Sequence, residues 1–312
     1  TTPDGNATFT VEANGTGLKY QWRVDGVDIP GANHNTLNLK PGGATIGGTK
    51  GFNEFFKGRI DDLRVYGRAL NASEIEVGAN FENSSSGTIA AGGAHSLFVK
   101  SDGSLWAMGD DSQNQLGNGP TNSSPTPYQK IINSDVIKVT AGNSHTLFIK
   151  SDGSLWAMGD DQNGQVGDGP ILNTGGYPVQ IMATGVVDVA GGTEHSLILK
   201  SDGSLWAMGY DYYGQLGNGS GNSGQNSPQK IIDSNVTAIA AGNMHSLFIK
   251  NDGSLWGMGH NGYGQLGTGD TNQRTSPVRI VESGVTGIGA GDNHSLFIKS
   301  GGALWTMGRN NY

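Results

Sequence analysis

The sequence predicts an all-β protein made of one repeated unit, and three observations support this prediction. A stretch close to HSLFIKSDGSLWAMG occurs four times, and a looser copy makes a fifth. The histidines that begin the copies lie 50, 50, 50 and 49 residues apart; they are His95, His145, His195, His245 and His294. Each copy combines short β-branched or aromatic runs with glycine turns, and 53 of the 312 residues are glycine. A fixed period of this size indicates an array of one supersecondary unit.

Four short strands can be placed in the second unit. The expected strands are residues 136–139, 145–150, 154–158 and 177–182. Asp152-Gly153 separates the second from the third and is a strong hairpin signal, because glycine adopts positive φ without steric cost. Within the third strand, Leu155 and Ala157 face one side while Trp156 and Met158 face the other. Both sides are apolar, so neighbouring sheets should cover both, and a four-stranded sheet repeated radially is a β-propeller blade.

The motif order within each unit also resembles a known repeat. The sequence runs xAxGxxHSL, then DGxLWxMG, then GQLGxG, which resembles the regulator of chromosome condensation repeat over residues 87–312. That resemblance implies a β-propeller, most often with seven blades. This chain shows five repeat cores, and the fifth is truncated at Tyr312, where GQLG would follow. The predicted fold is therefore all-β, a β-propeller of four-stranded antiparallel blades with a small β-rich N-terminal region.

The first 87 residues resemble parts of two other domains. Residues 1–40 alternate as strands, include a hairpin signal at Asp25-Gly26 and resemble part of a bacterial immunoglobulin-like domain with Trp22 in its core. Residues 41–87 contain FFKGRIDDLRVYGRALNASEIEVGAN, which resembles the closing segment of a laminin-G/concanavalin-like jelly roll and precedes a serine-rich linker. The expected organisation is thus residues 1–40, residues 41–87 and a propeller over residues 88–312.

Composition excludes several classes of function. Charged residues make up 15% of the chain and the net charge is −8, whereas nucleic-acid binders concentrate lysine and arginine. The absence of cysteine excludes disulfide scaffolds and thiol catalysis. No apolar run approaches the roughly 20 residues of a membrane span, so no membrane insertion is expected. The domain fragments before residue 88 resemble those of mosaic bacterial surface proteins, which implies an extracellular or cell-surface location.

The repeated histidines and tryptophans are expected to be structural. Five imidazoles around an axis could bind a metal, but each histidine begins a strand behind a glycine turn, where it can satisfy nearby polar groups. The repeated tryptophans are expected in the core; they are Trp106, Trp156, Trp206, Trp256 and Trp305. No Ser-His-Asp set, carboxylate pair or phosphate loop can be placed, so we expect neither catalysis nor a cofactor. Asp61 and Asp62 are weak calcium candidates through the jelly-roll resemblance.

The residues after each Met-Gly pair vary, although the strands hardly change. The first two units carry acidic loops with Asp110, Asp111, Asp160 and Asp161. The later units carry an aromatic set, made of Tyr210, Asp211, Tyr212, Tyr213, His260, Tyr263 and Arg309. Loops on a rigid scaffold commonly hold binding residues, and tyrosine is a good contact residue. These residues are therefore the predicted partner-binding face, and plain solvated loops are the alternative.

Three functions are compatible with these features. The first is a non-catalytic binding or scaffold module of a secreted or cell-surface multidomain protein, with a protein or glycan partner. The second is a structural subunit of an extracellular fibre, assembled by strand addition between copies of the chain. The third is an accessory carbohydrate-binding module of a larger enzyme, suggested by the jelly-roll resemblance.

Overall fold

The chain forms two compact units, Thr1–Ser84 and Ser85–Tyr312. The computed structural model describes residues 7–10, 23–24, 27–28, 36–39, 89–120, 126–169, 176–221 and 224–310. Within the first unit, the described strands are β1 (Ala7–Thr10), β2 (Arg23–Val24), β3 (Val27–Asp28) and β4 (Thr36–Leu39). Strand β1 pairs antiparallel with β4, and β2 pairs antiparallel with β3.

Strands β2 and β3 form a hairpin in the first unit. Val24 pairs with Val27, which confirms the hairpin predicted around Asp25-Gly26. The predicted jelly-roll segment, including Asp61 and Asp62, lies outside the described residues.

The second unit consists of five antiparallel sheets that follow one another along the chain, here called blades 1 to 5. Blade 1 contains β5 (Ile89–Ala91), β6 (His95–Val99), β7 (Leu105–Gly109) and β8 (Thr126–Ile132). Blade 2 contains β9 (Val136–Ala141), β10 (His145–Lys150), β11 (Leu155–Gly159) and β12 (Val179–Met182). Blade 3 contains β13 (Val186–Gly191), β14 (His195–Lys200), β15 (Leu205–Gly209) and β16 (Gln225–Ile232). Blade 4 contains β17 (Val236–Ala241), β18 (His245–Lys250), β19 (Leu255–Gly259) and β20 (Arg274–Val281). Blade 5 contains β21 (Val285–Ala290), β22 (His294–Lys299) and β23 (Leu304–Gly308).

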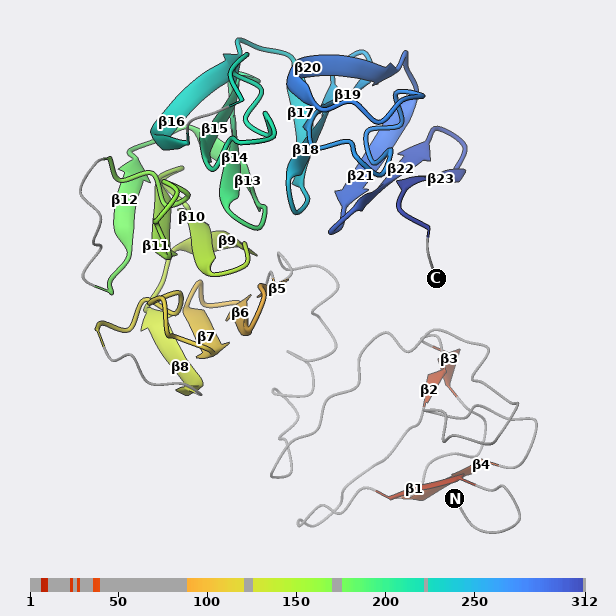
Figure 1. Ribbon diagram of the computed structural model, residues 1–312. Coiled ribbons are helices and arrows are strands. Elements are labelled where there is room, and N and C mark those ends of the chain that lie inside the picture. The colour runs from red at the N-terminus through yellow and green to blue at the C-terminus, as the bar shows by residue number, and fades with distance from the viewer. Residues whose placement is uncertain are drawn as a thin grey trace. The chain divides into compact units, whose positions relative to one another are not determined.

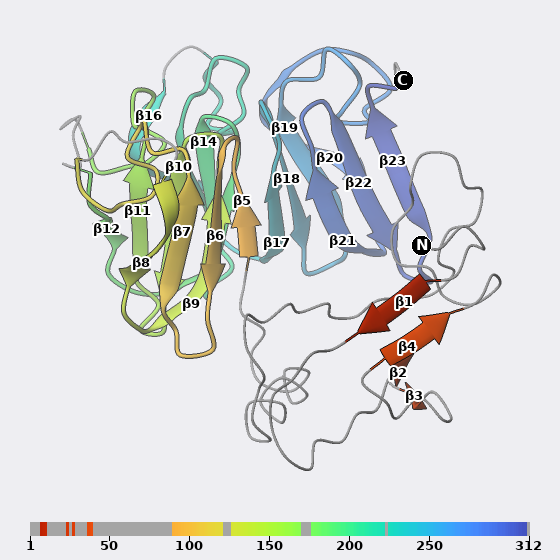
Figure 2. The same cartoon turned by 90° about the horizontal axis from the view of Figure 1, so that it is seen from below.

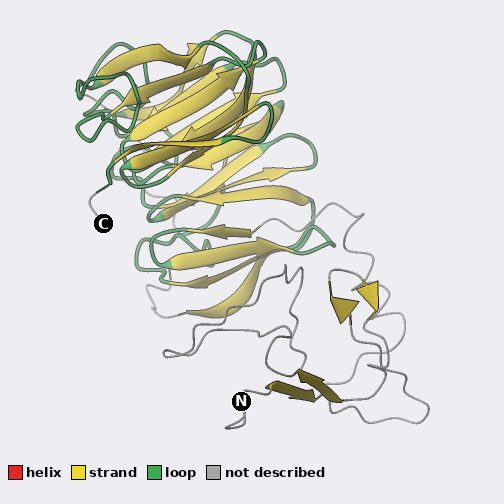
Figure 3. Cartoon of the chain, turned by 90° about the vertical axis from the view of Figure 1, so that its right-hand side faces the viewer, coloured by secondary structure: helices red, strands yellow, loops and turns green. Residues whose placement is uncertain are grey.

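The five blades lie around an arc, which confirms the predicted propeller arrangement (Figure 1). The first strand of every blade lies on the inner side of the arc, and these inner strands contact one another from blade to blade. Strands β8, β12, β16 and β20 form the outer edges. Figure 2 shows the strands of each sheet running side by side, and Figure 3 shows that the described residues form strands and loops.

Apolar side chains on both faces of each strand explain why the blades stack. Phe148 and Met158 of blade 2 pack against a buried cluster that includes Leu97 and Leu105 of blade 1. Leu155, on the opposite face of blade 2, joins the cluster shared with blade 3. The predicted assignment of alternate residues to opposite faces is therefore confirmed, and each cluster fills the space between two consecutive blades.

The tryptophans of blades 1 to 4 differ from the prediction, because their side chains are only half-buried. The indole N–H of Trp156 donates to Oγ of Ser154 at 2.9 Å, and the Nζ of Lys150 lies 4.2 Å from the indole centroid. Phe148 stacks alongside the same ring. An indole with a polar partner and a lysine over its face lies at the boundary of a core. Trp305 is 50% exposed, so its predicted place in the core is wrong.

The repeated histidines connect consecutive blades, which confirms their predicted structural role. The Nε2 of His145 in blade 2 lies 3.0 Å from Oγ of Ser196 in blade 3, and that hydroxyl donates to the carbonyl of Gln165 at 2.8 Å. The same contact recurs at the other three interfaces, between His95 and Thr146, His195 and Ser246, and His245 and Ser295. Because each hydroxyl gives its hydrogen to a carbonyl, the imidazole must donate from Nε2.

Candidate partner-binding site

The variable loops follow the third strand of each blade, and their first residues are fixed by backbone hydrogen bonds. The N–H of Tyr210 donates to the carbonyl of Glu194 at 2.8 Å, and that of His260 donates to Met244 at 2.8 Å. The acceptor is in each case the residue before the repeated histidine. The loops therefore start beside the turns that join the inner strands to the second strands.

The second residue of each loop is buried and holds the loop in shape. Asp111, Asp161 and Asp211 are at most 9% exposed. Their Oδ1 atoms accept backbone N–H groups five residues further on, for example from Leu216 to Asp211 at 3.0 Å. The prediction that these three aspartates contact a partner is wrong, because their carboxylates face the interior of the loop.

The first, third and fourth residues of the blade 3 loop and the first and fourth of the blade 4 loop bring aromatic rings together. The ring of Tyr210 stacks with that of Tyr212 at 6.3 Å, and Tyr212 meets Tyr213 edge-on at 5.1 Å. The ring of Tyr213 contacts that of His260, which belongs to the next blade, with 4.8 Å between the ring centroids. His260 in turn contacts Tyr263 at 5.8 Å. We call the continuous row from Tyr210 to Tyr263, together with Arg309, the aromatic ridge.

Part of the ridge is open to solvent. Tyr212 is 56% exposed and Tyr263 is 47% exposed. Arg309 of blade 5 is exposed, and its guanidinium lies 5.2 Å from the centroid of the Tyr263 ring. Burial lowers the pKa of His260 and raises the pKa of Tyr210, and both shifts favour the neutral form of the ring. The ridge therefore presents apolar ring surface with a positive charge at one end.

The loops of blades 1 and 2 differ from the ridge. Asp110 is half-buried and accepts hydrogen bonds from the hydroxyl of Ser112 at 2.8 Å and the side-chain amide of Gln115 at 3.0 Å. Asp160 is half-buried and accepts the N–H of Gln162 at 3.2 Å. Of the predicted acidic residues, Asp110 and Asp160 thus reach the surface, whereas Asp111 and Asp161 are buried.

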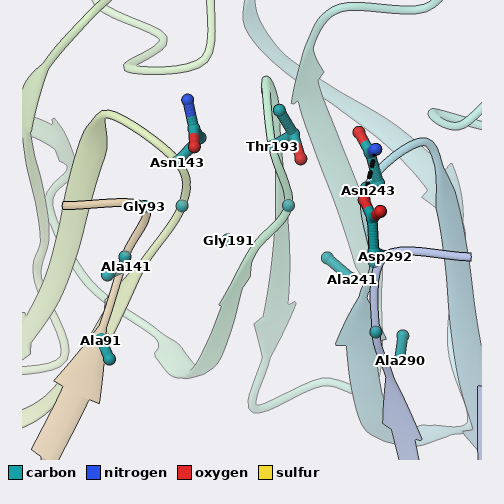
Figure 4. A pocket seen from close by; sticks show the side chains of 15 residues that line it. Ala91, Gly93, Ala141, Asn143, Gly191, Thr193, Ala241, Asn243, Ala290 and Asp292 are labelled. Carbon is teal, nitrogen blue, oxygen red and sulfur yellow. Dashed lines mark hydrogen bonds between the residues drawn. The ribbon is translucent and has the colours of Figure 1, made fainter.

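A depression at the inner ends of the blades was missed by sequence reasoning. It has a volume of about 240 Å³ and is lined by one turn from every blade, which is Ala-Gly-x in four blades and Gly191-Gly192-Thr193 in blade 3 (Figure 4). The polar side chains that line it are Asn143, Thr193, Asn243 and Asp292, and Nδ2 of Asn243 donates to Asp292 at 2.5 Å. The available signal was the pair of small residues that recurs upstream of each histidine, Ala-Gly in four blades and Gly191-Gly192 in blade 3. Small residues and backbone dominate this lining.

Metal-binding clusters and membrane-spanning helices are both absent from the described part of the chain. No group of three or more His, Cys, Asp or Glu residues is placed to hold a metal ion there. Among the same residues, no helix has the length and apolar character needed to cross a bilayer.

Comparison with protein families decides the family of the chain. A family model described as the RCC1-like domain matches residues 66–312. The chain belongs to the RCC1-like domain family. This result confirms the resemblance of the repeats to the regulator of chromosome condensation. A second model, the concanavalin A-like lectin/glucanases superfamily, matches residues 6–76, which supports the laminin-G-like part of the prediction. The immunoglobulin-like resemblance stays a prediction.

Solved structures show the same fold as this RCC1-like domain. Human WBSCR16 is 24% identical, with a TM-score of 0.61 over 72% of this chain and 63% of that chain. Prp20p from Saccharomyces cerevisiae is 22% identical, with a TM-score of 0.60 over 72% of this chain and 56% of that chain. Yeast RCC1 (Prp20), solved with Kap60, gives 22% identity and a TM-score of 0.62 over the same shares, 72% and 56%. The chain thus spans less than two thirds of these proteins. No curated protein matches it.

Proposed function

We propose that the RCC1-like domain of this chain is a non-catalytic module that binds a protein partner through the aromatic ridge. The similarity to Prp20p supports a protein partner, because that protein is described with binding properties to Gsp1p and histones. The other yeast structure, of RCC1 (Prp20) with Kap60 bound to it, also records a protein partner for a similar protein.

The observation that carries the proposal is the unbroken contact between rings of blades 3 and 4, ending at the guanidinium of blade 5. Tyrosine offers a large contact area and loses little rotamer entropy on binding. The rings are attached to strands whose apolar side chains are buried on both faces, so the surface is rigid before a partner arrives. The acidic loops of blades 1 and 2 would orient the same partner by its charge.

The experiment uses loop residues that the fold already accommodates. Tyr212 and Tyr213 occupy the same loop positions as Gln162 and Asn163 of blade 2. In both loops the fourth residue donates its N–H to the following glutamine side chain, at 3.0 Å for Tyr213 and at 2.9 Å for Asn163. The double variant Tyr212→Gln, Tyr213→Asn should therefore keep the loop and remove the rings.

A phage-displayed peptide library, panned on the wild-type chain, supplies the probe. Peptides selected on the wild type should bind the double variant at least tenfold more weakly, as measured by biolayer interferometry. The matched control is Gln162→Ala in blade 2, which should leave peptide binding unchanged. Equal binding to wild type and double variant would contradict the proposal.

The same samples separate the alternatives. A glycan array that gives ridge-dependent signal without any peptide binding would favour a carbohydrate partner. Fibres of the purified chain in electron microscopy, unaffected by the double variant, would favour the structural subunit. The extracellular or cell-surface location, which rests on the resemblance of the first 87 residues, stays a prediction.

A further inference from the structure

The free polar surface of the depression at the inner ends of the blades consists of oxygen atoms. Asn143, Thr193, Asn243 and Asp292 supply the polar side chains of its lining. A carboxylate can only accept hydrogen bonds, so the amide of Asn243 must turn its nitrogen toward Asp292 (Figure 4). The amide nitrogen of Asn143 likewise donates to Oγ of Ser144 at 3.3 Å. Both amide nitrogens are therefore used within the protein, and the side-chain oxygens remain.

Two of these side chains have unmet requirements. Oδ1 of Asn243 is shielded from solvent and accepts no hydrogen bond from the described residues, which is rare for a buried polar atom. Asp292 accepts hydrogen bonds from the neutral amides of Asn243 and Asn293, at 2.5 Å and 3.0 Å. None of the ion pairs among the described residues includes Asp292. The lining therefore suits a positively charged ligand with several N–H donors.

Further carboxylates lie at the mouth of the depression. Glu194 directly follows the lining residue Thr193, and burial together with the nearby charge of Asp160 raises its pKa. Asp110 and Asp160 begin the loops of blades 1 and 2, and their N–H groups donate to the turn residues just before the repeated histidines. Arg309 begins the corresponding loop of blade 5 and is basic. Three carboxylates against one guanidinium give this mouth a negative potential, which attracts a cation.

The size of the depression favours one side chain over a whole small molecule. Its volume of about 240 Å³ lies below the roughly 300–1,000 Å³ of small-molecule pockets. The glycines of the lining are required by packing, because a Cβ on Gly92 or Gly242 would lie 2.2 Å or 2.3 Å from Cε1 of the histidine in the same blade. Selection among ligands is therefore left to the polar side chains.

We infer that the depression receives an arginine side chain of the partner. This inference deepens the function proposed above and rests on it for the partner, since the depression and the aromatic ridge share one face. The N–H of Tyr210, the first ring of the ridge, donates to the carbonyl of Glu194, which is adjacent to the lining residue Thr193.

The chemistry of arginine matches the lining. A guanidinium holds five N–H donors in one plane and stays charged, so it can donate to Asp292 and to the oxygens of Asn243 and Thr193. Calcium also prefers oxygen, but it takes about six to eight oxygen ligands, commonly from several carboxylates. The lining supplies one carboxylate, that of Asp292. An organic cation with several donors is therefore the better fit.

The test is an NMR titration of the full chain with the synthetic peptide acetyl-Gly-Gly-Arg-Gly-Gly-amide. Backbone amide signals of the lining residues Gly142, Gly192 and Gly242 should shift saturably. A peptide with citrulline in place of arginine has nearly the same shape without the charge, and it should bind about tenfold more weakly. Asp292→Asn should weaken binding of the arginine peptide to a similar extent. This variant keeps the shape of the side chain and an oxygen that accepts from Asn243.

Two variants serve as controls. Asp233→Asn removes the same charge directly after β16, where Asp233 pairs with Lys230, and it should leave binding unchanged. Tyr212→Gln should also leave it unchanged, because the peptide carries no side chain for the ridge, so this test and that of the ridge can fail independently.

Four outcomes overturn the inference. They are the absence of saturable shifts, equal affinity for the citrulline peptide, unchanged binding to Asp292→Asn, and displacement of the peptide by calcium chloride alone, which would assign the site to a metal. The citrulline comparison needs no variant, so it decides the question even if Asp292→Asn is poorly folded.

Discussion

The Nε2 of His195 lies 2.9 Å from Oγ of Ser246, which belongs to the next blade. The same hydroxyl donates to the carbonyl of Gln215 at 2.7 Å. Ser246 therefore connects two polar groups of blade 3 to blade 4, and all three groups are buried. A buried polar contact of this kind is costly to break, because each group left behind has lost its water.

Replacing Ser246 by alanine should therefore destabilise the protein. The substitution leaves an imidazole N–H and a backbone carbonyl without a partner, so we expect a loss of about 1–3 kcal/mol in the free energy of unfolding. Urea titration followed by circular dichroism measures it. The matched control is Ser246→Thr, because Thr146 occupies the same position in blade 2 and makes the same contact with His95. A loss equal to that of the alanine variant would argue against the hydroxyl as the cause.

Gly192 lies in an inner turn that is packed too tightly to hold a larger residue. A Cβ on Gly192 would lie 2.2 Å from Cε1 of His195 and 2.7 Å from the carbonyl oxygen of Gly242. Gly192→Ala should lower the free energy of unfolding by about 1–3 kcal/mol, since either the imidazole or the neighbouring turn must move. Gly289→Ala is the control, because nothing lies within 4 Å of that added carbon. Equal thermal midpoints for the two variants would contradict this reading of the turn.

The buried histidines should make the propeller sensitive to acid. Burial lowers the pKa of His145 and of His195 from 6.5 to about 3. Below pH 6.5 the unfolded chain therefore binds protons that the folded chain does not bind. The free energy of unfolding falls as the pH drops. Each such histidine contributes a loss of about 1.4 kcal/mol per pH unit below 6.5. Thermal midpoints should change little between pH 7.5 and 6.5 and fall between pH 6.5 and 5; a constant midpoint below pH 6.5 would refute the expectation.

Asp161 and Asp168 of blade 2 should make the free energy of unfolding fall as the pH rises, which is the opposite of the effect of the histidines. Burial raises the pKa of Asp161 to about 7, and the neighbouring carboxyl of Asp168 adds to the effect. The folded chain thus holds a proton that the unfolded chain releases above pH 3.8, and the stability this gives is lost as the pH rises through about 7. Asp168→Asn should raise the free energy of unfolding at pH 8 by about 1–2 kcal/mol and change it little at pH 5.

Blade 3 provides the matched control for this pair. Asn218 takes the place of Asp168 there, opposite Asp211. Introducing Asn218→Asp should create a second carboxyl pair and lower stability at pH 8 more than at pH 5, as read by urea titration at the two pH values. The prediction fails if both substitutions shift stability equally at the two pH values.

The strands were predictable because their signals are local. Alternation assigned Leu155 and Trp156 to opposite faces, and Asp152-Gly153 marked the hairpin, where Gly153 has φ of 76°. Alternation does not show how far a neighbouring sheet covers a face. The half-buried indoles therefore could not be distinguished from core residues, and neither could the exposed Trp305.

The site was predictable only in part. Variation between the loops pointed to the tyrosines, whose rings the structure brings together across two blades. The burial of Asp211 depends on a hydrogen bond to the backbone five residues further on, which appears only after the loop has closed. A signal was present, since Asp or Asn stands at this second loop position in blades 1 to 4, as it does at Asn261. A loop position that stays constant among variable neighbours is more consistent with structure than with contact.

Each buried cluster in the second unit joins two consecutive blades and no others. Blades that are not neighbours are therefore coupled only through the blades between them. Loss of one buried cluster should uncouple the blades on its two sides and leave the other interfaces intact.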